Sequence, residues 1–167
     1  MNLHLQLLIK LVSALVLILF TSHAYAEDPK QIELFSVVEI EVVEKDDQGN
    51  EVVKRIPAKK VVPGTEVIYT TTFKYNSDQP GTDIVLTNPI PQFTVYKVGS
   101  ASGENTVIQY SVNNGQSFHS TAQLKVIDEE GNARAAQASD YTDIRWTYLG
   151  QLEKGDEGSV EFRVVLN

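Results

Sequence analysis

"VVPGTEVIYTTTFKYNSDQPGTDIVLTNPIP", residues 61–91, is the stretch that decides the fold. Its Pro63-Gly64 pair predicts a turn, because proline presets φ and glycine accepts a positive φ. From Val67 to Tyr75 apolar and polar residues alternate, which is typical of a half-buried β-strand. A second turn and a second short strand over 82–87 follow. The prolines at 89 and 91 end that strand because they lack the N–H that a ladder needs.

The rest of the chain repeats this pattern of short alternating runs separated by turns. Strands are predicted over 32–44, 51–56, 93–98, 106–112, 122–127, 143–149 and 159–166, with a loop over 133–138. The first two form a hairpin, and Asn113-Asn114-Gly115 is a strong signal for another one. The single tryptophan, Trp146, is expected to anchor a core between two sheets. The sequence therefore predicts an all-β, antiparallel sandwich.

Four segments in this order carry a resemblance to a known family. They are "VPGTEVIYTTTFKY" (62–75), "DIVLTNPIP" (83–91), "VGSASG" (98–103) and "IRWTYLGQLEKGDEGSVEFRVVLN" (144–167). Together they resemble the bacterial surface "conserved repeat domain", also catalogued as domain of unknown function eleven. The resemblance covers residues 60–167, in a single copy. It implies an immunoglobulin-like β-sandwich on an exported protein, and it implies no chemistry.

The first 26 residues have the pattern of a secretory signal peptide. Lys10 precedes an apolar run over 11–20, and small residues then lead to an expected cut between Ala26 and Glu27. An uncleaved anchor is the alternative, but the apolar run is short against the ~20 residues of a spanning helix. Three segments follow from this: a signal peptide (1–26), a strand and hairpin that form part of the sandwich (27–59), and the main domain (60–167). We expect a periplasmic, cell-surface-associated or secreted protein with no stable membrane anchor after cleavage.

Charge and cysteine content exclude several classes of function. The chain has 14 basic and 22 acidic side chains, so loss of Lys10 leaves 13 against 22 and a net charge of −9. Such a field repels phosphate, and we therefore expect no nucleic-acid partner. The absence of cysteine excludes disulfides, thiol nucleophiles and zinc-thiolate sites.

Two acidic turns are the candidates for a metal site. The candidate calcium ligands are Asp46, Asp47 and Asn50 in the first turn and Asp128 and Glu130 in the second. Calcium needs six to eight oxygen ligands, and the full calcium-loop pattern is not matched. Aspartate, asparagine and glycine are also the residues that tight turns require, and this interpretation is favoured. No cofactor is therefore predicted.

No catalytic group of residues stands out in the sequence. His119, which lies between Ser117 and Ser120, lacks a third group, and neighbouring strand residues point to opposite faces. A carbohydrate-binding or glycan-hydrolysing envelope protein is the alternative function. For that function Tyr96, Phe118 and Tyr141 are the candidate exposed aromatics.

The leading hypothesis is a non-enzymatic envelope or secreted module that acts through protein–protein contact. Its expected partner is an envelope or surface protein. Sandwiches have exposed sheet edges, and an added strand binds such an edge through main-chain hydrogen bonds. The candidate edges are the first strand, with Val37, Ile40 and Val43, and the last strand, with Val160, Phe162 and Val164.

Overall fold

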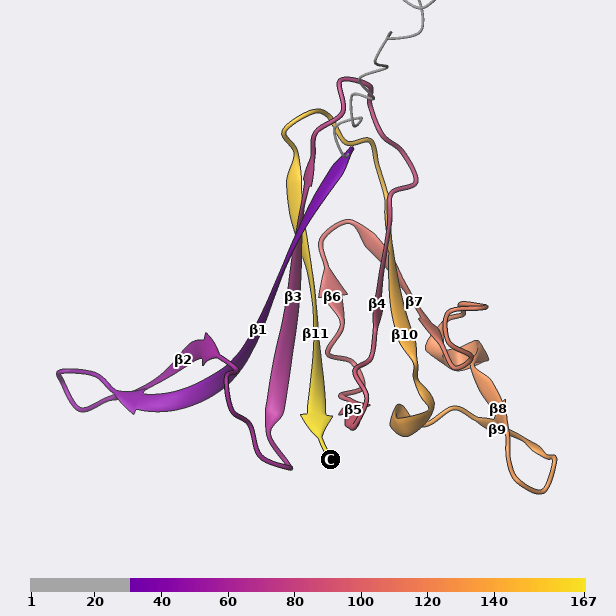
Figure 1. Cartoon of the computed structure of the whole chain (residues 1–167), viewed down its shortest axis with the longest axis horizontal. Helices are drawn as coiled ribbons and strands as arrows, with labels where there is room; N and C mark the ends of the chain where they lie inside the picture. The colour runs from indigo at the N-terminus through magenta and orange to yellow at the C-terminus, as the bar shows by residue number, and fades with distance from the viewer. Residues whose placement is uncertain (1–30) are drawn as a thin grey trace, which may run out of the picture.

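The computed structural model describes residues 31–167, and its regular secondary structure consists almost entirely of antiparallel strands (Figure 1). The predicted signal peptide and its cleavage site at Ala26 and Glu27 lie outside the described residues. The strands are β1 (Ile32–Lys45), β2 (Glu51–Pro57), β3 (Glu66–Tyr75), β4 (Val85–Pro89), β5 (Thr94–Tyr96), β6 (Ser102–Gly103), β7 (Thr106–Ser111), β8 (Lys125–Ile127), β9 (Ala133–Ala135), β10 (Asp143–Tyr148) and β11 (Glu157–Leu166). Two 3₁₀ turns, η1 (Thr121–Gln123) and η2 (Ala138–Asp140), lie between them.

Two sheets pack face to face. The larger sheet has the order β2-β1-β3-β11-β5, with β6 also paired to β11, and the smaller sheet has the order β4-β10-β7. Strands β8 and β9 form a separate small hairpin. The predicted all-β antiparallel sandwich is therefore confirmed, whereas the immunoglobulin-like classification stays a prediction.

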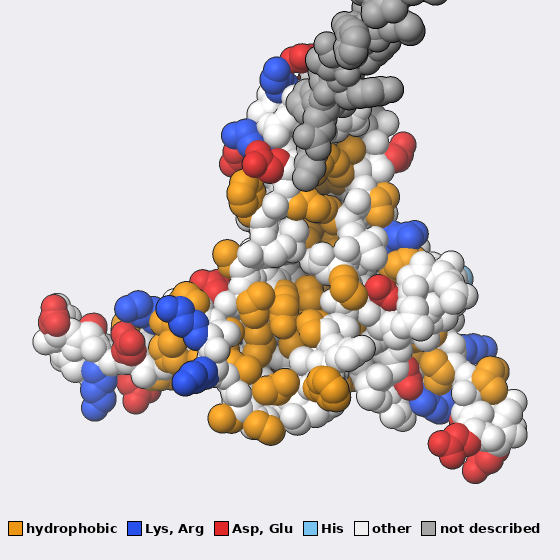
Figure 2. Space-filling model, viewed as in Figure 1, with side chains coloured by type: hydrophobic (Ala, Val, Ile, Leu, Met, Phe, Trp, Pro, Cys, Tyr) orange, Lys and Arg blue, Asp and Glu red, His pale blue; other side chains and the backbone are white. Residues whose placement is uncertain are grey.

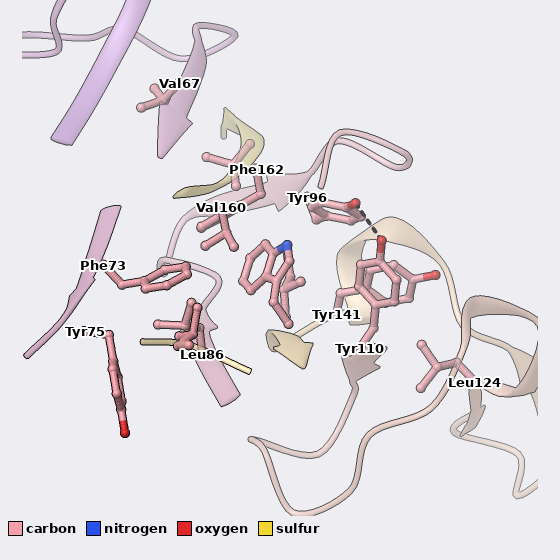
Figure 3. Close-up of a cluster of buried hydrophobic side chains, with 14 residues drawn as sticks. Val67, Phe73, Tyr75, Leu86, Tyr96, Tyr110, Leu124, Tyr141, Val160 and Phe162 are labelled. Carbon is pink, nitrogen blue, oxygen red and sulfur yellow. Dashed lines mark hydrogen bonds between the residues drawn. The ribbon is translucent and has the colours of Figure 1, made fainter. Parts of the chain in front are cut away.

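Aromatic side chains fill the space between the sheets (Figure 3). Trp146 on β10 is fully buried, and its ring centroid lies 6.1 Å from that of Phe162 on β11. Its indole N–H donates to the Ser102 carbonyl at 3.0 Å, so its polar atom is satisfied. The hydroxyls of Tyr96 and Tyr110 lie 3.2 Å apart in the same core. The predicted role of Trp146 as the anchor of the core is confirmed.

The first strand of residues 61–91, the stretch that decides the fold, forms as predicted. In β3, Val67, Phe73 and Tyr75 face the core and are at most 4% exposed. The following strand lies later than predicted, at Val85–Pro89, because Pro89 is tolerated at the end of an edge strand. The strand predicted over 93–98 shortens to Thr94–Tyr96 because Phe93 takes a positive φ of 61° and breaks the extended run.

The Asn-Gly signal gives the predicted turn but not the predicted hairpin. Asn114 and Gly115 have φ values of 56° and 75°. All six residues of β7 pair with β10 instead, and the segment after the turn makes one bridge, between Tyr110 and His119. Residues 122–127 divide into η1 and the short β8. Part of the predicted loop over 133–138 forms β9, which pairs with β8.

Two hairpins project from the sandwich as arms (Figure 1). The first arm consists of β2 and the second half of β1, joined by the predicted turn over 46–50. The second arm is the β8–β9 hairpin. Figure 2 shows Lys, Arg, Asp and Glu side chains gathered on both arms. The arms are therefore solvated, whereas the first half of β1 pairs with β3 in the body of the larger sheet.

A candidate interaction edge on β1

Half of β1 has an unpaired edge among the described residues. From Ile32 to Glu39 this strand pairs with β3 on one side. Its other side pairs with β2 only from Glu39 onward. The stretch 32–38 therefore lies at the border of the larger sheet, and we call it the β1 edge.

The direction of the backbone groups follows from two hydrogen bonds at the ends of the β1 edge. The Val38 carbonyl accepts from the Ala58 N–H at 2.9 Å on the β2 side, and the Gln31 carbonyl accepts from the Asn76 N–H at 2.8 Å on the β3 side. Successive residues of a strand direct their N–H and C=O groups to opposite edges. The even-numbered residues Ile32, Leu34 and Ser36 therefore present these groups outward.

Apolar side chains cover both faces of the β1 edge. Leu34 is 54% exposed and Phe35 is 57% exposed, and Val37 and Val38 are also exposed. Two pairs of adjacent apolar residues, 34–35 and 37–38, break the strict alternation of a half-buried strand. This doubling is the sequence signal for an edge with two apolar faces, and the sequence-based prediction missed Leu34 and Phe35.

The apolar face on the core side, with Leu34 and Val38, stays exposed because the smaller sheet does not extend under the β1 edge. The Asn88 amide of β4 donates to the Thr71 hydroxyl of β3 at 3.1 Å, so β4 lies opposite β3. Strand β4 is the border of its own sheet. On the core side the Ser36 hydroxyl lies 3.0 Å from the Thr71 hydroxyl. Leu34 and Val38 lie on the same face but extend beyond the border of the smaller sheet, so they stay exposed.

The predicted edge residues lie in different environments in the structure. Val37 lies on the unpaired β1 edge, whereas Ile40 packs against the core and Val43 lies in the arm paired with β2. The prediction that the last strand is an edge is wrong. Val160, Phe162 and Val164 are at most 1% exposed, and β11 is paired with β3 on one side and with β5 and β6 on the other.

An ion-pair network on the outer face holds the base of the first arm against the larger sheet. Arg163 of β11 donates to Glu41 of β1 at 2.9 Å and to Glu66 of β3 at 2.8 Å. Arg55 of β2 reaches Glu161 of β11 at 2.6 Å. These side chains cover Ile68, which is 1% exposed although it faces away from the main core. The network therefore holds the second half of β1, at Glu41, against β3 and β11.

Hydrogen bonds from Arg163 lower the pKa of both Glu41 and Glu66, with Lys97 adding to the effect at Glu66. Both carboxylates are therefore ionised at neutral pH. A glycosidase needs one carboxyl with a raised pKa as its general acid. Glu41 and Glu66 both have a lowered pKa instead, so neither carboxyl has the raised pKa that such an acid needs.

The acidic turns use their leading aspartates as caps. Asp46 accepts from the N–H groups of Gln48 and Asn50, and Asp128 accepts from those of Glu130 and Asn132. The remaining calcium candidates, Asp47 and Asn50, lie on the same solvated turn as Asp46. Among the described residues no group of three or more His, Asp or Glu side chains gathers to hold a metal ion. Turn geometry therefore accounts for these residues.

The remaining sequence candidates do not form a common site. His119 is exposed, while the Ser120 hydroxyl bonds Gln123 and the Ser117 hydroxyl accepts from Asn113. The prediction that Tyr96 and Tyr141 are exposed aromatics is wrong, because they are 1% and 7% exposed. The Arg145 guanidinium covers Phe118 at 3.6 Å from its ring centroid.

Comparisons with known proteins found no relative of this chain. No protein-family model, curated protein or solved structure matches the chain. Within residues 31–167 no helix is long and apolar enough to cross a membrane. The resemblance to the bacterial surface conserved repeat domain therefore stays a prediction from the sequence.

Proposed function

We propose that this protein is a non-catalytic, exported envelope or surface module that joins proteins by strand addition at the β1 edge. The observation that carries the proposal is an apolar strand with three outward-facing pairs of N–H and C=O groups. Natural sheets cover or charge such borders, because an uncovered one pairs with another chain. Export rests on the signal-peptide pattern of residues 1–26.

The energetics favour an extended peptide segment as the ligand. Each main-chain hydrogen bond stabilises a complex by about 0.5–1.5 kcal/mol, and apolar burial adds about 25 cal/mol per Å². An incoming strand gains both terms at the β1 edge, because Leu34 and Phe35 lie on either side of the exposed backbone groups. Specificity then comes from the side chains on the two faces.

Site-specific photo-crosslinking in the native cell envelope tests this function. A photo-reactive residue at Val37 should give defined polypeptide adducts, and the same residue at Ile127, on the β8–β9 arm, is the matched exposed control. Leu34→Pro should abolish the Val37 adducts, because it removes an N–H that points outward and not toward β3. Identical adducts at both positions, or adducts that survive Leu34→Pro, would exclude the β1 edge as the binding site.

Glycan binding is the second candidate function, and one hollow favours it. A hollow of about 470 Å³ lies between the β4–β5 loop and the start of β10. Phe93 on its rim is 77% exposed and held at a positive φ. Asp143 also lines the hollow, and its Oδ2 atom lies buried behind the surface, where it makes no hydrogen bond within the described residues. An exposed ring beside a carboxylate residue suits a sugar, which stacks on the ring and donates a hydroxyl to a carboxylate.

A glycan panel tests this second candidate independently of the first. Retention of a glycan should be lost in Phe93→Ala and in Asp143→Asn, and it should persist in Leu34→Pro. No retention by the unmodified protein would remove glycan binding and leave strand addition untouched.

A further inference from the structure

We infer that the strand added at the β1 edge is the β1 edge of a second copy of this chain. The two copies pair antiparallel about a two-fold axis that passes through the Leu34 pair. This inference rests on the proposed function and names its partner.

The backbone groups that have no partner within residues 31–167 select one register. Ile32, Leu34 and Ser36 are the outward-facing residues, and an axis at Leu34 pairs each of them with a free residue of the second copy. Leu34 then faces Leu34, and Ile32 faces Ser36. Moving the axis toward the C-terminus of the strand places one of these residues opposite Val38, whose carbonyl already accepts from the Ala58 N–H. A shift toward the N-terminus leaves Ser36 without a free partner among these three residues.

Charge on the β1 edge is compatible with self-pairing. Glu33 is the one charged residue between positions 32 and 38, and this stretch contains no lysine and no proline. In the Leu34-centred register Glu33 faces Phe35 of the second copy, so like charges do not meet directly. Charged and proline residues are the usual means of blocking self-pairing at a border strand. Their absence here favours an identical strand as the occupant.

On both faces of the paired strands, apolar side chains of one copy lie next to apolar side chains of the other. Leu34 of each copy lies on the side of the smaller sheet and meets its own counterpart across the axis. On the outer face the two Phe35 rings are diagonal neighbours, a separation that aromatic side chains span. A two-fold axis perpendicular to the sheet also brings the two exposed apolar faces together, so Leu34 of both copies gains cover. Closed two-fold dimers are the commonest form of self-association.

A single introduced cysteine tests the register directly. The natural chain contains no cysteine, so Leu34→Cys introduces one thiol per copy. Residues that exchange hydrogen bonds across antiparallel strands have Cα atoms about 5.5 Å apart, within the range that a disulfide spans. Leu34→Cys should form a disulfide-linked dimer much faster than Val53→Cys, which places an exposed thiol on β2. Equal rates would overturn the inference.

A charge-swap experiment separates self-association from binding of another protein. Leu34→Lys and Leu34→Glu should each weaken dimerisation about tenfold or more, because like charges meet across the axis. Their mixture should recover the dimer in sedimentation experiments from micromolar to millimolar concentration. Val53→Lys mixed with Val53→Glu is the control, because Val53 is exposed on β2 and lies away from the axis.

Two outcomes distinguish the inference from the proposed function. A chain that stays monomeric throughout, yet still gives Val37 adducts to another polypeptide, overturns self-association and retains strand addition. A monomer without such adducts overturns both.

Discussion

Gly158 is small because a core ring occupies the space where a side chain would lie. A Cβ atom built there falls 2.5 Å from Phe73 Cζ, which is far inside van der Waals contact. We expect Gly158→Ala to destabilise the fold by about 1–3 kcal/mol, because overpacking forces the ring or the backbone to move. Denaturant unfolding measures this. Ser159→Ala, at the exposed neighbouring residue, is the control, and an equal effect there would contradict the steric explanation.

The Tyr96 hydroxyl joins two groups that would otherwise be buried without a partner. It accepts from the Ala101 N–H at 3.1 Å and lies 3.2 Å from the Tyr110 hydroxyl. Tyr96→Phe should cost about 1–3 kcal/mol, because a buried donor loses its acceptor. Thermal or denaturant unfolding tests this. A stability within error of the natural protein would show that the core relaxes to satisfy both groups.

At the scale of elements, β1 should show alternating amide exchange. The N–H groups of Glu33, Phe35 and Val37 point toward β3, whereas those of Ile32, Leu34 and Ser36 point outward. In dilute protein we expect slow hydrogen exchange at the first set and fast exchange at the second, since only paired amides are protected. Residue-resolved exchange by NMR measures this, and uniform protection along β1 would contradict the assigned edge.

The network around Arg163 should make the junction of β1, β3 and β11 sensitive to acid. Hydrogen bonds from Arg163 and Lys97 lower the pKa of Glu66 below its ordinary value of 4.5. The folded state is therefore stabilised above that value, and the stabilisation is lost as the pH falls through the lowered pKa. Glu66→Gln should lose about 1 kcal/mol at pH 7, and the difference from the natural protein should close in acid.

Unfolding free energies measured across the acid range test this pH dependence. Glu129→Gln, in the exposed turn between β8 and β9, is the control. A difference between Glu66→Gln and the natural protein that stays constant with pH would rule out ionisation of Glu66 as the cause.

The sequence predicted the elements whose signals are local. The alternating strands β3, β10 and β11 formed as expected, and so did the turns at 46–50 and 63–64. Both signals act within a few residues, through the side-chain period of a strand and the residue types that a turn requires. The order of strands in the sheets depends on contacts between distant residues. For this reason β11 lies inside its sheet, although its alternating pattern gave no sign of partners on both sides. The pairing of β7 with β10 was missed for the same reason.

At the scale of the whole molecule, net charge opposes the contact that the β1 edge favours. The chain carries a formal charge of −8, so two copies repel each other at long range. Raising ionic strength from about 0.01 M to 0.15 M shortens the Debye length from about 30 Å to 8 Å. Self-association should therefore strengthen with salt over this range, as measured by sedimentation. Association that weakens with salt would show that ion pairs, and not the apolar β1 edge, hold the copies together.

Strands β1 and β11 both run antiparallel to β3 and lie on either side of it. Ile32 and Asn167 consequently lie at opposite ends of the larger sheet (Figure 1). A pulling force applied between these two points runs along the strands. It loads the hydrogen bonds of both ladders in shear, all at once, and cannot peel them apart one by one. The larger sheet should thus resist tension along its length, a mechanical property suited to the strand-addition module proposed above.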